Sequence, residues 1–216
     1  MGAALPKQYL PLSGTTVLEH TVQRVARHPL IQGVLVVVAP GDQYIHHLRL
    51  PESKTELIMA GGDERCHSVF NGLNVLAEQA AADDWVLVHD AARPCLRAAD
   101  ITRLIDELRD HPVGGLLGLP VTDTMKRTDR DANVLETVQR DGLWRALTPQ
   151  MFRLGLLRSA LEQALSKGLL VTDEAQAVEA AGYAPRMVEG HADNIKITRP
   201  QDLALAELYL QQQESA

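Results

Sequence analysis

The chain has 216 residues, of which 45% are hydrophobic and only 4% aromatic, and its formal net charge is −7. This length suits one α/β domain with an aliphatic core. The acidic balance argues against a protein that binds nucleic acid along a basic face, although a phosphate site needs only a few local cations. The sequence has no apolar run long enough to span a bilayer and no signal-peptide pattern at its start.

The chain contains two cysteines, Cys66 and Cys95. Two isolated thiols do not make a disulfide framework, and they suit a reducing compartment. Together with the composition, they lead us to expect a cytoplasmic protein that contacts neither a membrane nor nucleic acid.

Apolar, β-branched runs alternate with amphipathic segments along most of the chain. In chain order the sequence predicts helix 16–27, strands 34–38 and 57–60, helix 64–78, strand 85–89, helix 100–110, strand 115–121, and helices 152–166, 173–181 and 200–212. Thr16 and Glu19 have the spacing of a capping box at the first helix. Strands that alternate with helices predict a Rossmann-like α/β fold, with a mostly parallel sheet flanked by helices.

Residues 122–144 break this pattern, because charged and turn residues dominate them. Two short extended runs flank a polar tip at 129–133, which predicts a β-hairpin arm. An arm with so little apolar surface cannot form a core alone, so we expect it to pack on a partner, most simply a second copy of the chain. We interpret residues 1–216 as a single domain that includes this arm at about 121–146.

Two segments in the first third of the chain could bind a polyanion. Lys7 follows Pro6 in a loop and could hold a phosphate as a point charge, or it could be an ordinary surface lysine. The segment Gly61–Arg65, with Ser68 one turn later, follows a predicted strand and opens a helix. Its glycines and the helix N-terminus suit an anion or the polar edge of a base. A strand-to-helix turn with no ligand would show the same sequence pattern.

Two further segments carry a carboxylate and cations. Asp90 ends the strand 85–89, and ligands of open parallel sheets bind beyond such strand ends. Arg93, three residues later, could face a phosphate through two parallel hydrogen bonds. Asp90 could instead cap backbone N–H groups. Lys196 lies in a short predicted strand that leads toward the same sheet end, or it is a surface lysine on an edge strand.

These segments belong to a longer series, which reads PKQYL, GGDER, VHDAARP, DTMKR, GLWRALTPQ, TDEAQA and ADNIKITRPQDLALAE in chain order. The series resembles that of the 2-C-methyl-D-erythritol 4-phosphate cytidylyltransferases, and the resemblance covers essentially the whole chain. It implies transfer of CMP from CTP to 2-C-methyl-D-erythritol 4-phosphate, with release of pyrophosphate, in non-mevalonate isoprenoid precursor synthesis. It also implies Mg²⁺ or another divalent cation as cofactor, and a homodimer clasped by the arms.

The resemblance assigns roles to particular residues. The implied catalytic residues are Lys7, Arg140 and Lys196. The implied CTP-binding residues are Gly62, Asp63, Ser68, Asp90 and Ala91, and Asp90 would also bind the metal. The implied residues for the acceptor phosphate are Arg93, Thr124, Arg140, Thr148, Thr172 and Lys196. Thr124 and Arg140 lie in the arm, so the resemblance places them in the partner's site.

The family pattern starts with an apolar strand and a Gly-rich loop before the PKQY segment, and this sequence has no counterpart of either. The chain therefore reads as a shortened member of the family, or as a non-catalytic nucleotide-binding relative. Retention of Lys7, Asp90 and Lys196 favours the first interpretation. Burial of four or five side chains of such a strand contributes on the order of 6–15 kcal/mol, so we expect the 216-residue chain alone to be marginally stable or aggregation-prone. Without the Gly-rich loop we expect it to be at best a weak nucleotide binder.

The acceptor is a second open question. Ribitol phosphate cytidylyltransferases share much of the same pattern, as do transferases that act on other sugar phosphates. The sequence therefore predicts the reaction type more firmly than the acceptor.

Overall fold

The computed structural model describes residues 5–215 of the chain. Its elements are η1 (Lys7–Tyr9), β1 (Pro11–Leu12), β2 (Thr15–Thr16), α1 (Val17–Ala26), β3 (Val34–Val37), η2 (Ile45–His47), β4 (Thr55–Ile58), α2 (Arg65–Leu76), β5 (Trp85–Val88), α3 (Ala98–Leu108), β6 (Gly114–Pro120), β7 (Met125–Thr128), β8 (Val134–Val138), β9 (Trp144–Arg153), α4 (Leu154–Ser166), α5 (Glu174–Ala180), β10 (Arg186–Glu189) and α6 (Gln201–Glu214).

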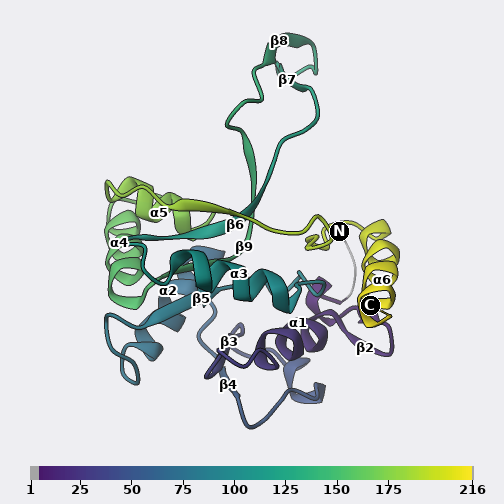
Figure 1. Ribbon diagram of the computed structural model, residues 1–216. Helices are drawn as coiled ribbons and strands as arrows, with labels where there is room; N and C mark the ends of the chain where they lie inside the picture. The colour runs from purple at the N-terminus through teal and green to yellow at the C-terminus, as the bar shows by residue number, and fades with distance from the viewer. Residues whose placement is uncertain (1–4, 216) are drawn as a thin grey trace.

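The largest sheet has four strands in the order β10-β6-β9-β5. β10 is parallel to β6, whereas β9 is antiparallel to both of its neighbours. A separate parallel pair, β3-β4, lies beside α1 (Figure 1). The α/β fold expected from the sequence is confirmed, but its strand directions are mixed, where we predicted a mostly parallel sheet.

The difference arises from β9, a ten-residue strand that the sequence did not predict. Its inner half contains Thr148, Pro149 and Gln150, which do not look like a buried apolar strand. Both Thr148 and Gln150 are nevertheless buried, and their polar groups find partners in other segments. β9 also takes the first two residues of the predicted helix 152–166, so α4 begins at Leu154.

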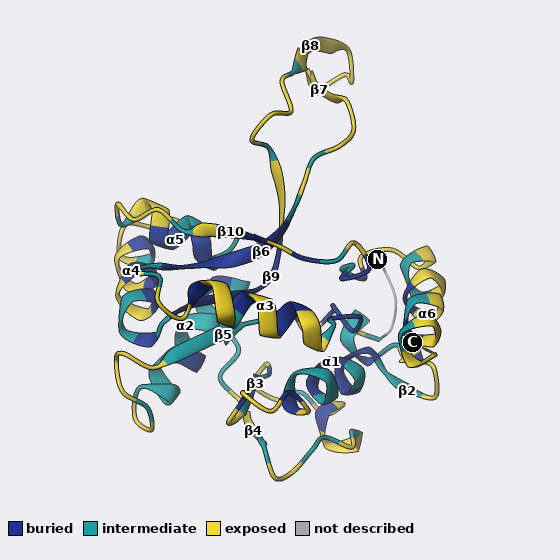
Figure 2. Ribbon diagram, viewed as in Figure 1, coloured by how far each residue is buried: buried dark blue, intermediate teal, exposed yellow. Residues whose placement is uncertain are grey.

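Helices cover both faces of the four-stranded sheet, and neighbouring residues of one strand enter different cores. On one face α4 contributes Leu157 and Leu161, and α5 contributes Val178, to a cluster that contains Phe152 of β9. On the other face α3 contributes Leu104 to a cluster that contains Met151. Adjacent side chains of a strand point to opposite faces, so the sheet separates two buried layers, visible in dark blue in Figure 2.

A third cluster fixes the segment that carries Lys7. Tyr9 packs against Leu18 of α1 and Val36 of β3. Its hydroxyl donates to Asp42 Oδ2 at 2.6 Å. Because Lys7 and Tyr9 belong to the same short 3-10 helix, burial of Tyr9 restricts the position of Lys7.

Strands β3 and β5 are not hydrogen-bonded to each other in the part of the chain that the structure describes, so β5 is an edge strand. Its apolar residues, from Trp85 to Val88, are all only half-buried. Such a run is normally buried on both faces of an α/β sheet. β5 is thus less buried than such runs normally are, and the marginal stability of the chain stays a prediction.

The expected arm is present as the antiparallel hairpin β7-β8, which projects away from the rest of the molecule (Figure 1). Figure 2 shows that it is exposed along almost all of its length. Three of its apolar side chains are exposed, Met125 by 41%, Val134 by 60% and Leu135 by 62%. The arm thus carries apolar surface that the described residues of its own chain do not cover.

The segment that carries Lys196 differs from its prediction. Residues 194–199 form no strand; they are irregular. The Ile197 N–H donates to the Ala92 carbonyl at 2.8 Å, which holds this segment against the loop after β5. The sequence also did not predict β1, β2 and β10.

Two other expectations concern the whole chain. Cys66 and Cys95 are free and buried, as two isolated thiols predicted. Within residues 5–215, every helix is too short or too polar to cross a membrane.

The predicted capping box of α1 is confirmed, and it leads to a test of stability. Glu19 accepts hydrogen bonds from the Thr16 and Arg49 backbone N–H groups, both at 2.8 Å. Burial opposes ionisation of Glu19, but these hydrogen bonds outweigh it and lower its pKa below the ordinary value of 4.5. A lowered pKa in the folded state means that the ionised side chain stabilises the fold at neutral pH. That stabilisation disappears as pH falls through the folded-state pKa.

We expect Glu19→Gln to lower the free energy of unfolding by roughly 1–3 kcal/mol at pH 7, because an amide cannot accept all of these hydrogen bonds. Urea denaturation at pH 7 and pH 4 measures the effect, and the difference from the wild type should shrink at the lower pH. The matched control is Glu78→Gln at an exposed position after α2, which should leave stability unchanged. A constant difference at both pH values would contradict the role of the ionised Glu19.

Candidate active site

The carboxylate of Asp90 lies at the carboxyl end of β5 and binds three cations. Arg65 Nε is 2.9 Å from Oδ1, while Arg93 Nε and Lys196 Nζ are 3.2 and 3.1 Å from Oδ2. Asp90 is buried, which opposes its ionisation, but the charges of Arg65 and Lys196 outweigh this effect. They hold the pKa of Asp90 well below its ordinary value, so the carboxylate is ionised. The sequence left open whether Asp90 caps backbone groups, and the structure shows it bound to cationic side chains.

Lys7 approaches the same carboxylate from η1. Its pKa is lowered, first by burial and then by the positive charge of Lys196, while Asp90 raises it. Lys7 is therefore close enough to feel both charges, although it makes no ion pair with Asp90 among the described residues. Two lysines that repel each other beside one carboxylate favour a site that takes up further negative charge.

A short chain of hydrogen bonds supports the backbone at Asp90. The Asp90 N–H donates to Thr148 Oγ1 at 3.1 Å, and Thr148 Oγ1 lies 2.9 Å from His89 Nδ1. His89 Nε2 lies 3.1 Å from the Arg93 carbonyl, which can only accept. Burial lowers the pKa of His89 to about 4, so the ring is neutral at pH 7. Nε2 must then carry the proton, and Nδ1 accepts from Thr148.

Arg93 serves the same loop. Its Nη1 donates to the Asn194 carbonyl at 2.7 Å, and Asn194 Nδ2 donates to the Thr148 carbonyl at 2.7 Å. Arg93 is buried and bonded to Asp90 as well. These contacts join the loop after β5, strand β9 and the segment of Lys196 into one rigid unit.

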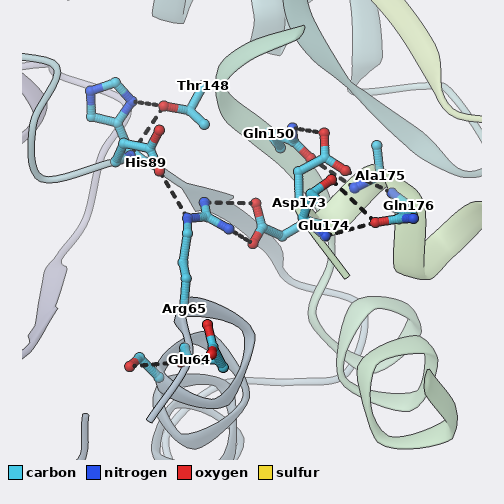
Figure 3. Close-up of polar contacts among 12 residues, drawn as sticks. Glu64, Arg65, His89, Thr148, Gln150, Asp173, Glu174, Ala175 and Gln176 are labelled. Atoms are coloured by element: carbon cyan, nitrogen blue, oxygen red, sulfur yellow. Dashed lines mark hydrogen bonds and ion pairs between the residues drawn. The ribbon is translucent and has the colours of Figure 1, made fainter. Parts of the chain in front are cut away.

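Arg65 connects Asp90 with α5. Its Nη1 and Nη2 donate to the two carboxylate oxygens of Glu174 at 2.6 and 3.1 Å (Figure 3). Gln150 of β9 supports the start of the same helix, because it donates to Asp173 and accepts from the Ala175 N–H. Neither Arg65 nor Glu174 was predicted as a site residue by itself, although Arg65 ends the predicted Gly61–Arg65 segment.

The loop between β4 and α2 is open to solvent at Gly62 and Asp63. A Cβ at Gly61 would lie 2.9 Å from backbone atoms at the end of β3, and one at Gly62 would lie 2.4 Å from His67 Cβ. Both positions therefore need glycine for close approach. The Gly62 N–H donates to Ser68 Oγ at 3.0 Å, which closes the turn over the first residues of α2.

The structure brings some of the predicted site residues together and leaves others apart. Arg93 and Lys196 bond to the Asp90 carboxylate, and Thr148 accepts from the Asp90 N–H. The charge of Asp90 also acts on the pKa of Lys7. Gly62, Asp63 and Ser68 lie on the loop that leads to Arg65, and Ala91 is exposed beside Asp90. Thr172 is exposed just before α5, where its N–H and hydroxyl both bond to Gln176.

Thr124 and Arg140 stand apart from this cluster. Both are exposed on the arm, and Arg140 donates to the Thr122 carbonyl. The arm projects away from the body that carries Asp90 (Figure 1). Among residues 5–215, neither of these two side chains bonds to Asp90 or to the cations around it.

The residues around Asp90 fit a divalent cation that is held mainly by the phosphate oxygens of a bound ligand. Among the described residues, no three His, Cys, Asp or Glu side chains gather as a metal site. Mg²⁺ commonly binds one or two carboxylates together with phosphate oxygens and water. Within residues 5–215, Oδ1 of Asp90 has one hydrogen-bond partner and Oδ2 has two, so Oδ1 retains an acceptor position.

Comparison with known proteins gives a consistent result. The family model of 2-C-methyl-D-erythritol 4-phosphate cytidylyltransferase (IspD) matches residues 1–212. Among curated proteins, the cytidylyltransferase of that name from Pseudomonas aeruginosa is 54% identical over 204 residues, which are 94% of this chain and 87% of the relative. The protein of the same name from Aeromonas hydrophila is 53% identical over 215 residues, with 86% of its own length covered.

Solved structures agree. A crystal structure of 4-diphosphocytidyl-2C-methyl-D-erythritol synthase matches with a TM-score of 0.87 and 40% identity, and 95% of each chain is covered. The 2-C-methyl-D-erythritol 4-phosphate cytidylyltransferase of Francisella tularensis matches with a TM-score of 0.85 and 37% identity over 95% of this chain and 93% of that one. The sequence match, the shared fold and the cluster around Asp90 all agree: this chain belongs to the 2-C-methyl-D-erythritol 4-phosphate cytidylyltransferase family.

Proposed function

We propose that the chain transfers the cytidylyl group of CTP to the phosphate of 2-C-methyl-D-erythritol 4-phosphate and releases pyrophosphate. The observation that carries this proposal is the cation cluster around one ionised carboxylate in a chain of this family. Lys7, Arg65, Arg93 and Lys196 supply four positive charges, and Asp90 and Glu174 supply two negative ones. The net positive charge suits two polyanionic substrates that must approach each other.

The chemistry needs little from the protein beyond charge and position. An oxygen of the acceptor phosphate attacks the α-phosphorus of CTP, and the bond from that phosphorus to the bridging oxygen breaks, so pyrophosphate leaves. The attacking oxygen is already anionic, so the protein need not supply a general base. Lys7 and Lys196, which lie near each other and near Asp90, would stabilise the charge that builds on the α-phosphate and hold the acceptor.

The other proposed residues bind the two substrates. Gly62, Asp63 and Ser68 would contact the cytidine part of CTP, and Asp90 and Ala91 would lie near its ribose and α-phosphate. Thr148, Thr172 and Arg93 are proposed on the acceptor side, where Arg93 holds the loop in position through Asn194. A Mg²⁺ ion bound through Asp90 and the triphosphate would neutralise charge on the leaving pyrophosphate.

We also propose a homodimer in which each arm completes the partner's site. Two observations support it: Arg140 is exposed and lies on an arm that projects from its own body, and Val134 and Leu135 are largely uncovered. Arg140 would then position the acceptor phosphate beside the partner's Lys196. The two free thiols suit a reducing compartment, so we propose that the protein is located in the cytoplasm.

The reaction is tested by incubating the chain with CTP, Mg²⁺ and 2-C-methyl-D-erythritol 4-phosphate and following pyrophosphate release and the diphosphocytidyl product by ³¹P NMR. We expect product with this acceptor, much less with ribitol phosphate, and none after removal of divalent cations with EDTA. A higher kcat/KM with ribitol phosphate would identify the alternative acceptor. Binding of CTP without pyrophosphate release would instead identify a non-catalytic relative.

Removal of either lysine should lower the rate with little effect on folding. We expect Lys7→Met and Lys196→Met each to reduce kcat by about 10²–10³-fold, the cost of losing one preorganised group that stabilises transition-state charge. Steady-state kinetics measures the loss, and the thermal midpoint checks the fold. Lys167→Met, at an exposed position after α4, is the matched control and should keep the wild-type rate.

Mixing two inactive variants tests whether the arm acts in the partner's site. Arg140→Ala and Lys196→Ala should each be inactive alone. In a mixture that exchanges subunits, mixed dimers have one intact site, so about a quarter of the wild-type activity should return at random pairing. If Arg140 served its own chain, every site would lack one residue, and mixing would restore nothing.

A further inference from the structure

Arg65 bonds at once to Asp90 and to Glu174. It is the first residue of α2, and Glu174 is the first residue of α5. The guanidinium places Nε at 2.9 Å from Asp90 Oδ1 and turns its other two nitrogens to the two oxygens of Glu174, at 2.6 and 3.1 Å. One planar group thus links two carboxylates that belong to different parts of the fold.

Glu174 fixes the position of this guanidinium. Its side chain is 1% exposed, and Ala175 and Val178 of the same helix belong to the buried core. The Asp173 carboxylate accepts from the Gln176 N–H and from Gln150 Nε2, so the start of α5 is held from both sides. Figure 3 shows Arg65 reaching from α2 to this point. A paired, two-bond contact to an immobile carboxylate leaves Arg65 little rotational freedom.

This geometry has a consequence for the carboxylate of Asp90. Arg93 and Lys196 both bind Oδ2, so within residues 5–215 Arg65 is the group that bonds to Oδ1. Loss of Arg65 would leave the carboxylate held through one oxygen and free to turn about it. Oδ1 can accept two hydrogen bonds or metal contacts, and Arg65 occupies one of these positions. The other position keeps a defined direction only while Arg65 is bound.

The same contact sets a distance across the site. The loop before α2 carries Gly62 and Asp63, and the segment before α5 carries Thr172. The proposed function places CTP against the first and the acceptor against the second. Since Arg65 and Glu174 begin the two helices, their ion pair fixes how far apart the two loops stand.

We propose that Arg65, clamped by Glu174, is a positioning residue for cytidylyl transfer. It orients Asp90 toward the metal-bound triphosphate of CTP and fixes the spacing between the two substrate loops, without touching either substrate. The inference rests on the proposed function. A lysine cannot replace this arginine, because an ammonium is a point charge and cannot bond to both carboxylates in one plane.

The first test is Arg65→Lys in the full chain. Lysine keeps the positive charge, so the protein should fold, but it cannot make the paired hydrogen bonds of the guanidinium. We expect kcat to fall by about 10- to 100-fold, as for other residues that orient a metal ligand, while KM for CTP changes little. The matched control is Arg153→Lys, because Arg153 binds the Asp83 carbonyl and stacks on Trp85 at the opposite end of β5. This control should keep the wild-type kcat.

The second test separates positioning from stability. Arg65→Met alone would leave the buried Glu174 carboxylate without a cationic partner. It is therefore combined with Glu174→Leu, because an apolar pair can replace a buried ion pair without loss of stability. We expect the double variant to melt near the wild-type temperature yet keep the low kcat. Its affinity for Mn²⁺ with CTP, followed by the EPR signal of the ion, should also be weaker, while its affinity for CTP without metal should not change.

Three outcomes would overturn the inference. They are wild-type kcat in Arg65→Lys, recovery of kcat along with the melting temperature in the double variant, and Mn²⁺–CTP affinity equal to that of the wild type. A wild type that forms no product would contradict the proposed reaction, and the Mn²⁺–CTP measurement would still decide whether Arg65 orients Asp90. A wild type that also fails to bind Mn²⁺–CTP would contradict both.

Discussion

A buried carboxylate at the end of a strand must be neutralised, and most of the site follows from how this chain neutralises Asp90. An ionised group in a poorly solvated position is stable only with close, well-directed partners. Three cations provide them, from α2, from the loop after β5 and from the irregular segment before α6. This requirement draws Arg65 of α2 to two segments that the Ile197–Ala92 and Arg93–Asn194 hydrogen bonds also join, and it leaves a surplus of positive charge around Asp90.

The sequence predicted the parts of this arrangement that depend on neighbours along the chain. The capping box of α1, the polar hairpin and the position of Asp90 at a strand end all come from local patterns. Lys7 and Lys196 could be predicted as site residues from the resemblance to the family. The sequence directed Lys196 toward the same sheet end as Asp90, but its ion pair with Oδ2 and the effect of the Asp90 charge on Lys7 depend on tertiary structure.

The features that were missed share one cause. β9 was hidden because Thr148 and Gln150 read as loop residues, and their burial makes sense only once Asp90, Asp173 and Ala175 supply hydrogen-bond partners. A short strand was predicted around Lys196, but hydrogen bonds from Ile197 to Ala92 and from Arg93 to Asn194 hold that segment as irregular chain. In each case the deciding hydrogen bonds join residues that are distant in sequence.

The separation between Arg65 and Glu174, which are 109 positions apart, also determines when the site can form during synthesis. A ribosome releases Arg65 and Asp90 long before it reaches Glu174, and Lys196 follows later still. Until then Arg65 and Asp90 have each other as partners, and Asp90 also has Arg93, but they lack Glu174 and Lys196. A chain interrupted before α5 would therefore leave two nitrogens of the Arg65 guanidinium without the carboxylate that pairs with them in the finished fold.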